Sequence, residues 1–301
     1  MKKTLIALAT LAVAGTAFAQ SVTLSGAIGP EYSRSTAANN QATLANGDAG
    51  ATNFALTATE DLGGGLKVTA YMQQRFNAVS GANANSALSS DAGLPRGLQN
   101  VYLGVSGGFG SVIAGRFLTG PSGAYDAFGQ WGTKGDYANA GVIGARNDNT
   151  VQYTTPSFNG FSATVATTVT TGTNKEYTYA RLSYSNGPLS VSYAAEKNQT
   201  AQGDKMQDIG ASYDLGVAKV MVLNGKNTTA GVDTSNTSVG VRVPMGAATL
   251  KASFRSGDTD NGSAVGVDYA LSKRTSLYAD MGKVSTSGTQ TAYRFGMKHS
   301  F

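Results

Sequence analysis

The chain has no cysteine, a single histidine and only 6 prolines among its 301 residues. Without cysteine no disulfide can form, so the fold must be held by hydrogen bonds and packing. The one histidine, His299, has no cluster of cysteine, aspartate or glutamate around it in the sequence. Zinc sites and hydrolytic triads need several such groups together. These absences argue against a disulfide-stapled domain, a zinc protein and most hydrolases.

Long apolar runs are also missing after residue 20. A membrane-spanning helix needs about 20 consecutive apolar residues, so a helical membrane protein is excluded. Strands that cross a membrane carry lipid-facing residues only at alternate positions, so a transmembrane barrel is still compatible with the sequence.

Charge is mild and scattered. The formal net charge is +5, of which Lys2 and Lys3 account for two, which leaves +3 for residues 20–301. No basic run suggests a nucleic-acid partner. The turn glycines form no Gly-x-x-x-x-Gly-Lys-Ser/Thr pattern between a strand and a helix, so no nucleotide cofactor is expected. No pattern of oxygen ligands requires calcium.

The first nineteen residues have the three parts of a secretory signal. Lys2 and Lys3 provide the charged region, residues 5–14 form a short apolar region, and Ala17-Phe18-Ala19 is a small-x-small cleavage site. We therefore expect residues 1–19 to be removed on export across an inner membrane, and the mature chain to begin at Gln20.

The last thirteen residues alternate strictly. From Tyr293 to Phe301 every odd position is bulky or amphipathic, and the positions between are small or cationic. This is the period of a β-strand with two different faces. On its own, the segment fits either the edge strand of a soluble sandwich or a strand of a membrane barrel.

Similar segments recur along residues 20–301, and they form one domain. We expect sixteen strands, at residues 21–32, 53–60, 66–77, 98–106, 111–116, 147–155, 161–171, 177–185, 189–196, 206–213, 217–226, 235–243, 248–256, 263–271, 275–284 and 289–301.

Short turns alternate with longer polar loops, such as residues 33–52, 78–96, 197–205 and 227–234. This asymmetry favours an all-β fold, a transmembrane antiparallel β-barrel, over a sandwich. The last segment should pair with the first and remove both sheet edges.

One connection is much longer than the rest. Residues 117–145 lack alternation and carry several aromatic residues, including the only tryptophan, Trp131. A loop of this length in a compact domain is usually functional or disordered, and its aromatics argue against free solvation. We expect it to fold into the barrel interior, the lumen, and to narrow it.

If the apolar face points outward, the inward acids are Asp208, Asp268 and Asp280, and basic residues outnumber them. The inward bases would be Lys67, Arg75, Arg181, Lys219, Arg242, Lys251, Arg255, Arg294 and Lys298. A lysine or arginine facing lipid at the bilayer midplane costs about 2–4 kcal/mol, which supports this assignment. Cationic rings attract anions, so a mild anion preference follows.

The candidate constriction consists of wall residues that face charged residues of the long loop. The wall set is Arg146, Arg75, Arg181, Arg242, Arg255, Arg294 and Lys298, and the loop set is Lys134, Asp126 and Asp136. Alternatively, several of these arginines lie near a rim or tie the loop to the wall through carboxylates.

Aromatic residues share the outward face of the predicted strands. They are Tyr153, Phe161, Tyr184, Tyr193, Tyr213, Phe254, Tyr269, Tyr293 and Phe295, and we expect them to form girdles at the two membrane interfaces.

Several motifs in order resemble the general porins of Gram-negative bacteria, specifically the betaproteobacterial type. They are Glu60-Asp61-Leu62-Gly63-Gly64-Gly65-Leu66-Lys67, Ser106-Gly107-Gly108-Phe109-Gly110 with Gly115-Arg116, Asn149-Thr150-Val151-Gln152-Tyr153, Tyr184-Ser185-Asn186-Gly187-Pro188, Tyr269-Ala270-Leu271-Ser272-Lys273-Arg274 and the ending His299-Ser300-Phe301. The resemblance covers the whole chain.

The resemblance implies a sixteen-stranded barrel in the outer membrane, surrounded by its lipids and usually a homotrimer. Such barrels pass ions and small hydrophilic solutes passively, and their third external loop folds into the pore. Phe301 would be the signal to the outer-membrane assembly machinery. His299 stands where porins often have tyrosine. Asn53 stands where many relatives have arginine, so the resemblance does not imply the full set of wall cations found in those relatives.

Two other functions remain to be separated from a pore. An outer-membrane lipase or protease needs catalytic groups that the chain does not concentrate. A closed barrel that serves as an adhesin would have a blocked lumen. Conductance in a planar bilayer distinguishes the pore from both.

Overall fold

The computed structural model describes residues 20–36, 40–47, 52–82, 98–118, 146–169, 177–198, 204–285 and 289–301. Within these ranges the chain forms eighteen β-strands. None of the helical structure in these ranges is long and apolar enough to cross a membrane.

The strands are β1 (Gln20–Ile28), β2 (Pro30–Ser35), β3 (Ala42–Asn46), β4 (Asn53–Gly63), β5 (Leu66–Arg75), β6 (Asn100–Gly107), β7 (Gly110–Leu118), β8 (Arg146–Thr154), β9 (Phe161–Thr168), β10 (Tyr177–Asn186), β11 (Leu189–Asn198), β12 (Asp204–Asp214), β13 (Lys219–Thr229), β14 (Val232–Met245), β15 (Ala248–Gly257), β16 (Asn261–Ala270), β17 (Thr275–Ser285) and β18 (Thr289–Ser300).

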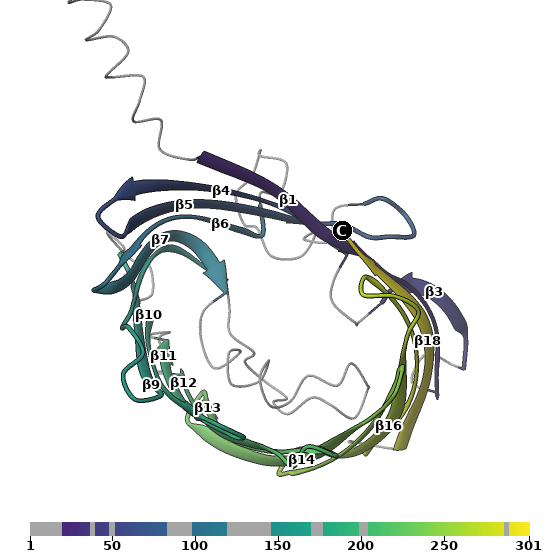
Figure 1. The fold of residues 1–301 in the computed structure, drawn as a ribbon. Helices are drawn as coiled ribbons and strands as arrows, with labels where there is room; N and C mark the ends of the chain where they lie inside the picture. The colour runs from purple at the N-terminus through teal and green to yellow at the C-terminus, as the bar shows by residue number, and fades with distance from the viewer. Residues whose placement is uncertain are drawn as a thin grey trace, which may run out of the picture.

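Sixteen of these strands form a closed antiparallel ring around a central space (Figure 1). From β4 to β18 each strand pairs with the next, and β1 lies between β18 and β4. The predicted all-β barrel of sixteen strands is confirmed.

The first predicted strand, 21–32, is divided in two. Gly29 separates β1 from β2, and its N–H donates to Thr52 Oγ1 at 3.1 Å instead of joining the sheet. Pro30 has no N–H to donate, so the ladder changes partners here. β1 pairs with β4, whereas β2 pairs with β18 and β3. The predicted polar loop 33–52 is therefore wrong for residues 42–46, which form β3.

The predicted polar loop 227–234 is wrong as well. β13 continues to Thr229 and β14 begins at Val232, so only two residues turn the chain. Ala230 and Gly231 both have positive φ, 52° and 80°. This is the requirement of the type I′ turn, whose twist matches that of the flanking strands. Polar residues on both strands hid the alternation, because this hairpin extends past the apolar part of the wall.

The predicted pairing of the last strand with the first is confirmed. Gly26 and Phe301 exchange both backbone hydrogen bonds, each 3.1 Å long. A Cβ on Gly26 would lie 2.6 Å from Cζ of the Phe301 ring, so only glycine leaves room for this closure. The sheet thus has no free edge at the join between its first and last strands.

The outer surface of the ring is apolar. Leu24, Leu103, Val265 and Phe295 are each more than half exposed in the single chain. Small or polar residues alternate with them, and Ala55 and Ala194 on the inner face are buried. Exposed apolar surface on this scale needs lipid around it. Of the aromatics predicted to face outward, Tyr184 is half-buried against Phe161, with ring centroids 4.5 Å apart, and the others are exposed.

Candidate functional site

The lumen wall carries the charged side chains of the strands. On β15, for example, buried Lys251 and Arg255 alternate with Leu250 and Phe254, whose side chains are exposed on the other face. A strand sends successive side chains to opposite sides, so one face can be charged and the other apolar. The inner wall is therefore the candidate functional site.

The wall from β14 to β17 is crossed by ion pairs. Lys251 Nζ lies 2.8 Å from Asp268 Oδ1 and 3.3 Å from Asp280 Oδ1, and Arg242 Nη2 lies 3.7 Å from Asp268 Oδ2. The side chains of Lys251 and Asp280 are only 5% and 2% exposed. We call Arg242, Lys251, Asp268 and Asp280 the ion-pair cluster. Its two cations are balanced by its two acids.

A glycine makes this cluster possible. Gly266 stands between Lys251 and Asp280 in the cross-strand register. A Cβ at Gly266 would approach Asp280 Oδ1 to 1.8 Å. The absence of a side chain therefore lets the carboxylate reach across β16 to the lysine.

Arg294 on β18 also has an acidic partner. Its Nε lies 3.8 Å from Glu31 Oε1, and the hydroxyl of Tyr278 donates to Glu31 Oε2 at 2.8 Å. Glu31 is 4% exposed. Sequence reasoning missed Glu31, although its place in the alternation of segment 21–32 would have put it on the inner face. The positive charge of Arg294, which was predicted to favour anions in the pore, is therefore paired with a carboxylate.

Arg255 is withdrawn from the lumen water. It is 1% exposed, and its Nη2 lies 2.5 Å from Oδ1 of Asp260, which is 9% exposed. Asp260 lies in the short connection between β15 and β16. This buried pair ties β15 to the connection that follows it, and the constriction role of Arg255 stays a prediction.

The wall from β4 to β8 is organised differently. Arg146 Nε donates to Asn100 Oδ1 at 3.1 Å, Asn100 Nδ2 donates to Gln73 Oε1 at 2.6 Å, and Gln73 Nε2 donates to Asn53 Oδ1 at 3.1 Å. We call these four residues the amide row. Arg75 is half-buried on β5, opposite Asn53 in the register. The structure therefore brings predicted Arg146 and Arg75 to the same part of the wall.

The remaining predicted cations lie elsewhere. Arg181 on β10 and Lys298 on β18 are half-buried and have no ion pair among the described residues. Lys134, Asp126 and Asp136 lie outside the described residues, as does most of segment 117–145. The constriction role of each wall cation, and the inward fold of that segment, stay predictions.

Two further acids face inward on β11 and β12. Glu196 is 5% exposed and Asp208 is 1% exposed. Asp208 was expected there, but Glu196 was missed although it shares the parity of inward Ser192 and Ala194. An ion pair that the sequence did not predict joins Arg116 Nη1 to Asp148 Oδ1 at 2.5 Å, next to the start of segment 117–145.

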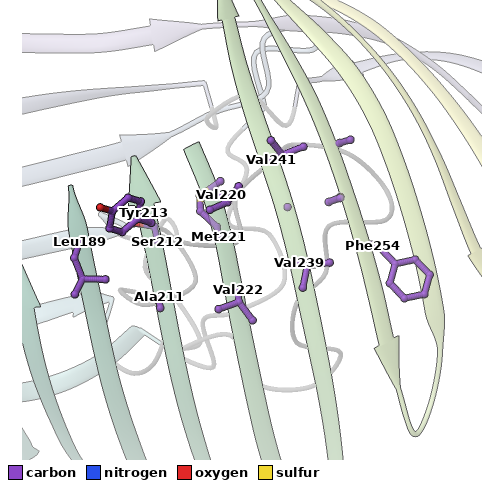
Figure 2. A pocket seen from close by; sticks show the side chains of 13 residues that line it. Leu189, Ala211, Ser212, Tyr213, Val220, Met221, Val222, Val239, Val241 and Phe254 are labelled. Atoms are coloured by element: carbon purple, nitrogen blue, oxygen red, sulfur yellow. The ribbon is translucent and has the colours of Figure 1, made fainter. Parts of the chain in front are cut away.

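An apolar depression lies outside the lumen. It holds about 610 Å³ and spans β11 to β15 (Figure 2). Its apolar lining includes Tyr213, Val222, Val239 and Phe254, which belong to the exposed outer face. Because this face contacts lipid, the depression fits acyl chains and not a water-borne solute.

Metal chemistry has no support in the part of the chain that the structure describes. No three histidine, cysteine, aspartate or glutamate side chains gather there in a way that could hold a metal ion. His299 Nδ1 lies 2.9 Å from Thr275 Oγ1, and the histidine is exposed on the outer face.

Comparisons with known proteins fit this architecture. A model of the Gram-negative porin family matches residues 4–289. The chain is 30% identical to outer membrane porin protein 32 of Delftia acidovorans and 27% identical to an outer membrane porin protein of Bordetella pertussis. Both matches cover 100% of this chain and 100% of the relative.

Solved structures share the fold. An anion-selective porin from Comamonas acidovorans superimposes with a TM-score of 0.78 at 24% identity, over 94% of this chain and 100% of that chain. A trimer form of OmpT from Vibrio cholerae has a TM-score of 0.67 at 15% identity, over the same shares of the two chains.

Proposed function

The chain belongs to the Gram-negative porin family, and from this premise we propose that its channel favours small anions over cations. As a member of that family it is an outer-membrane barrel for the passive diffusion of small hydrophilic solutes. The proposal concerns the sign of its charge selectivity and the residues that set it.

The exposure of the inner charges carries the proposal. The inward acids Glu31, Glu196, Asp208 and Asp280 are all buried, whereas Asp268 and Asp148 keep contact with water and are each paired with a cation. Most inward cations are half-buried or exposed, namely Lys67, Arg75, Arg146, Arg181, Lys219, Arg242 and Lys298. Charges in contact with water govern the field that a passing ion meets. The printed name of the Comamonas acidovorans structure, an anion-selective porin, agrees with this sign.

A reversal-potential measurement tests the proposal. Purified protein is placed in a planar bilayer with a potassium chloride gradient, and the zero-current voltage is recorded. We expect stepwise open channels and a voltage whose sign indicates that chloride is the more permeable ion. A potassium-selective channel would contradict the charge argument, and a barrel without conductance would instead support the closed adhesin.

We propose that residues 117–145 form the constriction, with Lys134, Asp126 and Asp136 opposite the wall cations. A chain lacking residues 119–145 should conduct in larger steps, because nothing would narrow the lumen. Equal step sizes in the shortened and complete chains would contradict this role. We expect the channel to work without a cofactor or a catalytic reaction.

The assembly is proposed to be a homotrimer, in keeping with the trimer form of the Vibrio cholerae protein. Light scattering of the detergent-purified protein, corrected for detergent, would give three chain masses. We further propose that Phe301 is read by the outer-membrane assembly machinery. A Phe301→Ala variant should fail to insert and should accumulate in the periplasm. Normal amounts of folded barrel in the outer membrane would contradict that role.

A further inference from the structure

A short row of aromatic rings crosses the inner wall on β5, β6 and β7. Tyr71 and Tyr102 stand directly opposite each other, with ring centroids 5.1 Å apart and planes inclined by 22°. Tyr102 meets Phe117 edge to face, with centroids 5.9 Å apart and an angle of 83°. We call these three residues the aromatic row. Such offset-stacked and edge-to-face pairs are favourable arrangements of aromatic rings.

Alternation along β7 contributes the third ring, because Phe117 follows inward-facing Gly115 by two residues. The pairing of β7 with β8 is irregular between Gly115 and Phe117, where an advance of two residues along β7 matches an advance of three along β8. Gly115 has φ of 149°, and a Cβ there would lie 2.2 Å from the carbonyl oxygen of Val101. Phe117 is buried against Tyr102. Tyr71 and Tyr102 keep part of their surface exposed.

The amide row lies beside the aromatic row. Gln73 follows Tyr71 by two residues on β5, and Asn100 precedes Tyr102 by two on β6, so the two rows run parallel. Two residues along a strand correspond to about 7 Å. Arg146 brings its guanidinium to the amide row through its bond to Asn100. A flat apolar surface and a cationic polar edge thus stand about 7 Å apart on the same wall.

We propose that this part of the wall is a binding station for carboxylates with a flat apolar body, represented by benzoate. The ring of the solute stacks on Tyr71 and Tyr102, and its carboxylate accepts charge-assisted hydrogen bonds from Arg146. The spacing between the rows matches the distance from the centre of the benzoate ring, through its carboxylate and one hydrogen bond, to the guanidinium of Arg146. A small inorganic anion would use only the arginine, and a neutral sugar would use only the rings and amides.

The test is block of the channel current by benzoate. Full-length protein is recorded in a planar bilayer in potassium chloride, with sodium benzoate or sodium acetate added at equal ionic strength. Benzoate should interrupt the chloride current in a saturable way, and acetate should not. This inference rests on the proposed function, because it needs an open pore. Protein that forms no channel in potassium chloride contradicts both, whereas an open channel that treats benzoate and acetate alike overturns only the binding station.

Matched variants assign the block to the rows. Tyr71→Leu should weaken the block about 3- to 10-fold, the size of one aromatic contact, while Tyr71→Phe keeps the ring and the block. Arg146→Gln should weaken it about tenfold through the lost charged hydrogen bond. Conductance in potassium chloride alone verifies that each variant is folded.

Three results would overturn the station. They are wild-type block in Tyr71→Leu, wild-type block in Arg146→Gln, and equal block by a neutral sugar. If a variant fails to assemble, the comparison of benzoate with acetate and sugar on the unaltered chain still decides.

Discussion

The inner wall has two sides that use charge in opposite ways. On β14 to β17 the ion-pair cluster holds Lys251 and Asp280 almost out of contact with water, and Arg242 shares Asp268 with Lys251. On β5 to β8 the arginine Arg146 donates to the amide of Asn100, and aromatic rings lie on the same part of the wall. The charges of the first side hold strands together, and the second side presents a cation and flat surfaces to a solute. A count of inward arginines therefore overstates the field that a passing ion meets.

The largest effect should follow from removing the lysine of the ion-pair cluster. Among the residues that the structure describes, Lys251→Met leaves Asp268 with the more distant Arg242 as its ion-pair partner, and it leaves Asp280 without its lysine. Breaking a buried pair in this way costs about 3–5 kcal/mol. Urea titration, followed by the mobility of unheated protein in a detergent gel, measures the loss. Lys251→Arg keeps the charge and should lose much less, and equal stability of Lys251→Met and wild type would disprove the structural role of the cluster.

A smaller loss should follow from filling the gap at Gly266. The methyl group of Gly266→Ala collides with the Asp280 carboxylate and pushes it away from Lys251. Overpacking of this kind costs about 1–3 kcal/mol. The same urea titration applies. The double variant with Asp280→Gly has space for the methyl group, so the steric part of the cost should disappear there. If Gly266→Ala is as stable as wild type, the carboxylate has another position available.

The charge selectivity should respond to exposed cations and ignore neutral buried pairs. Arg181→Gln removes a half-buried cation and should lower the preference for chloride in the reversal-potential measurement. The double variant Arg255→Met, Asp260→Leu removes a buried pair with no net charge, so its reversal potential should equal that of wild type. Such replacement by apolar groups is often tolerated by the fold. A larger shift in the double variant than in Arg181→Gln would refute the distinction between the two kinds of charge.

The smallest effect is expected outside the lumen. Lys226 Nζ lies 2.8 Å from Asp233 Oδ2 on the exposed hairpin of β13 and β14. Exposed ion pairs contribute little, because water screens them and two long side chains must be ordered. Lys226→Gln should leave both the urea midpoint and the reversal potential unchanged. A clear loss of stability would mean that this exposed ion pair stabilises the barrel as the buried pairs do, which would contradict the distinction between them.

The sequence predicted the strands better than the connections. Alternation identified all sixteen strands of the ring, because each has one apolar and one polar or small face. It failed at Gly29 and at residues 227–234, for two different reasons. Pro30 interrupts a ladder without interrupting the alternation, and the end of the β13–β14 hairpin is polar on both faces. A two-residue turn in such a segment looks like a loop.

The candidate site was only partly predictable. Alternation told which side chains face the lumen, including Arg242, Arg255 and Arg294. It could not tell that Asp268, Asp260 and Glu31 hold them, because partners come from other strands or turns, and Glu31 and Arg294 lie near opposite ends of the chain. The aromatic row was missed for a similar reason, since its three rings are separated in sequence and meet only through the cross-strand register.

The sequence by itself determined which face of each strand meets lipid and which meets water, since a period of two is local to a strand. It also determined that the chain must close on itself, because its first and last segments would otherwise be free edges. Only the tertiary structure decided which charges neutralise each other and which reach the lumen water. Those outcomes depend on the cross-strand register, on glycines such as Gly266 that open a path between side chains, and on burial, and none of these is local to a segment.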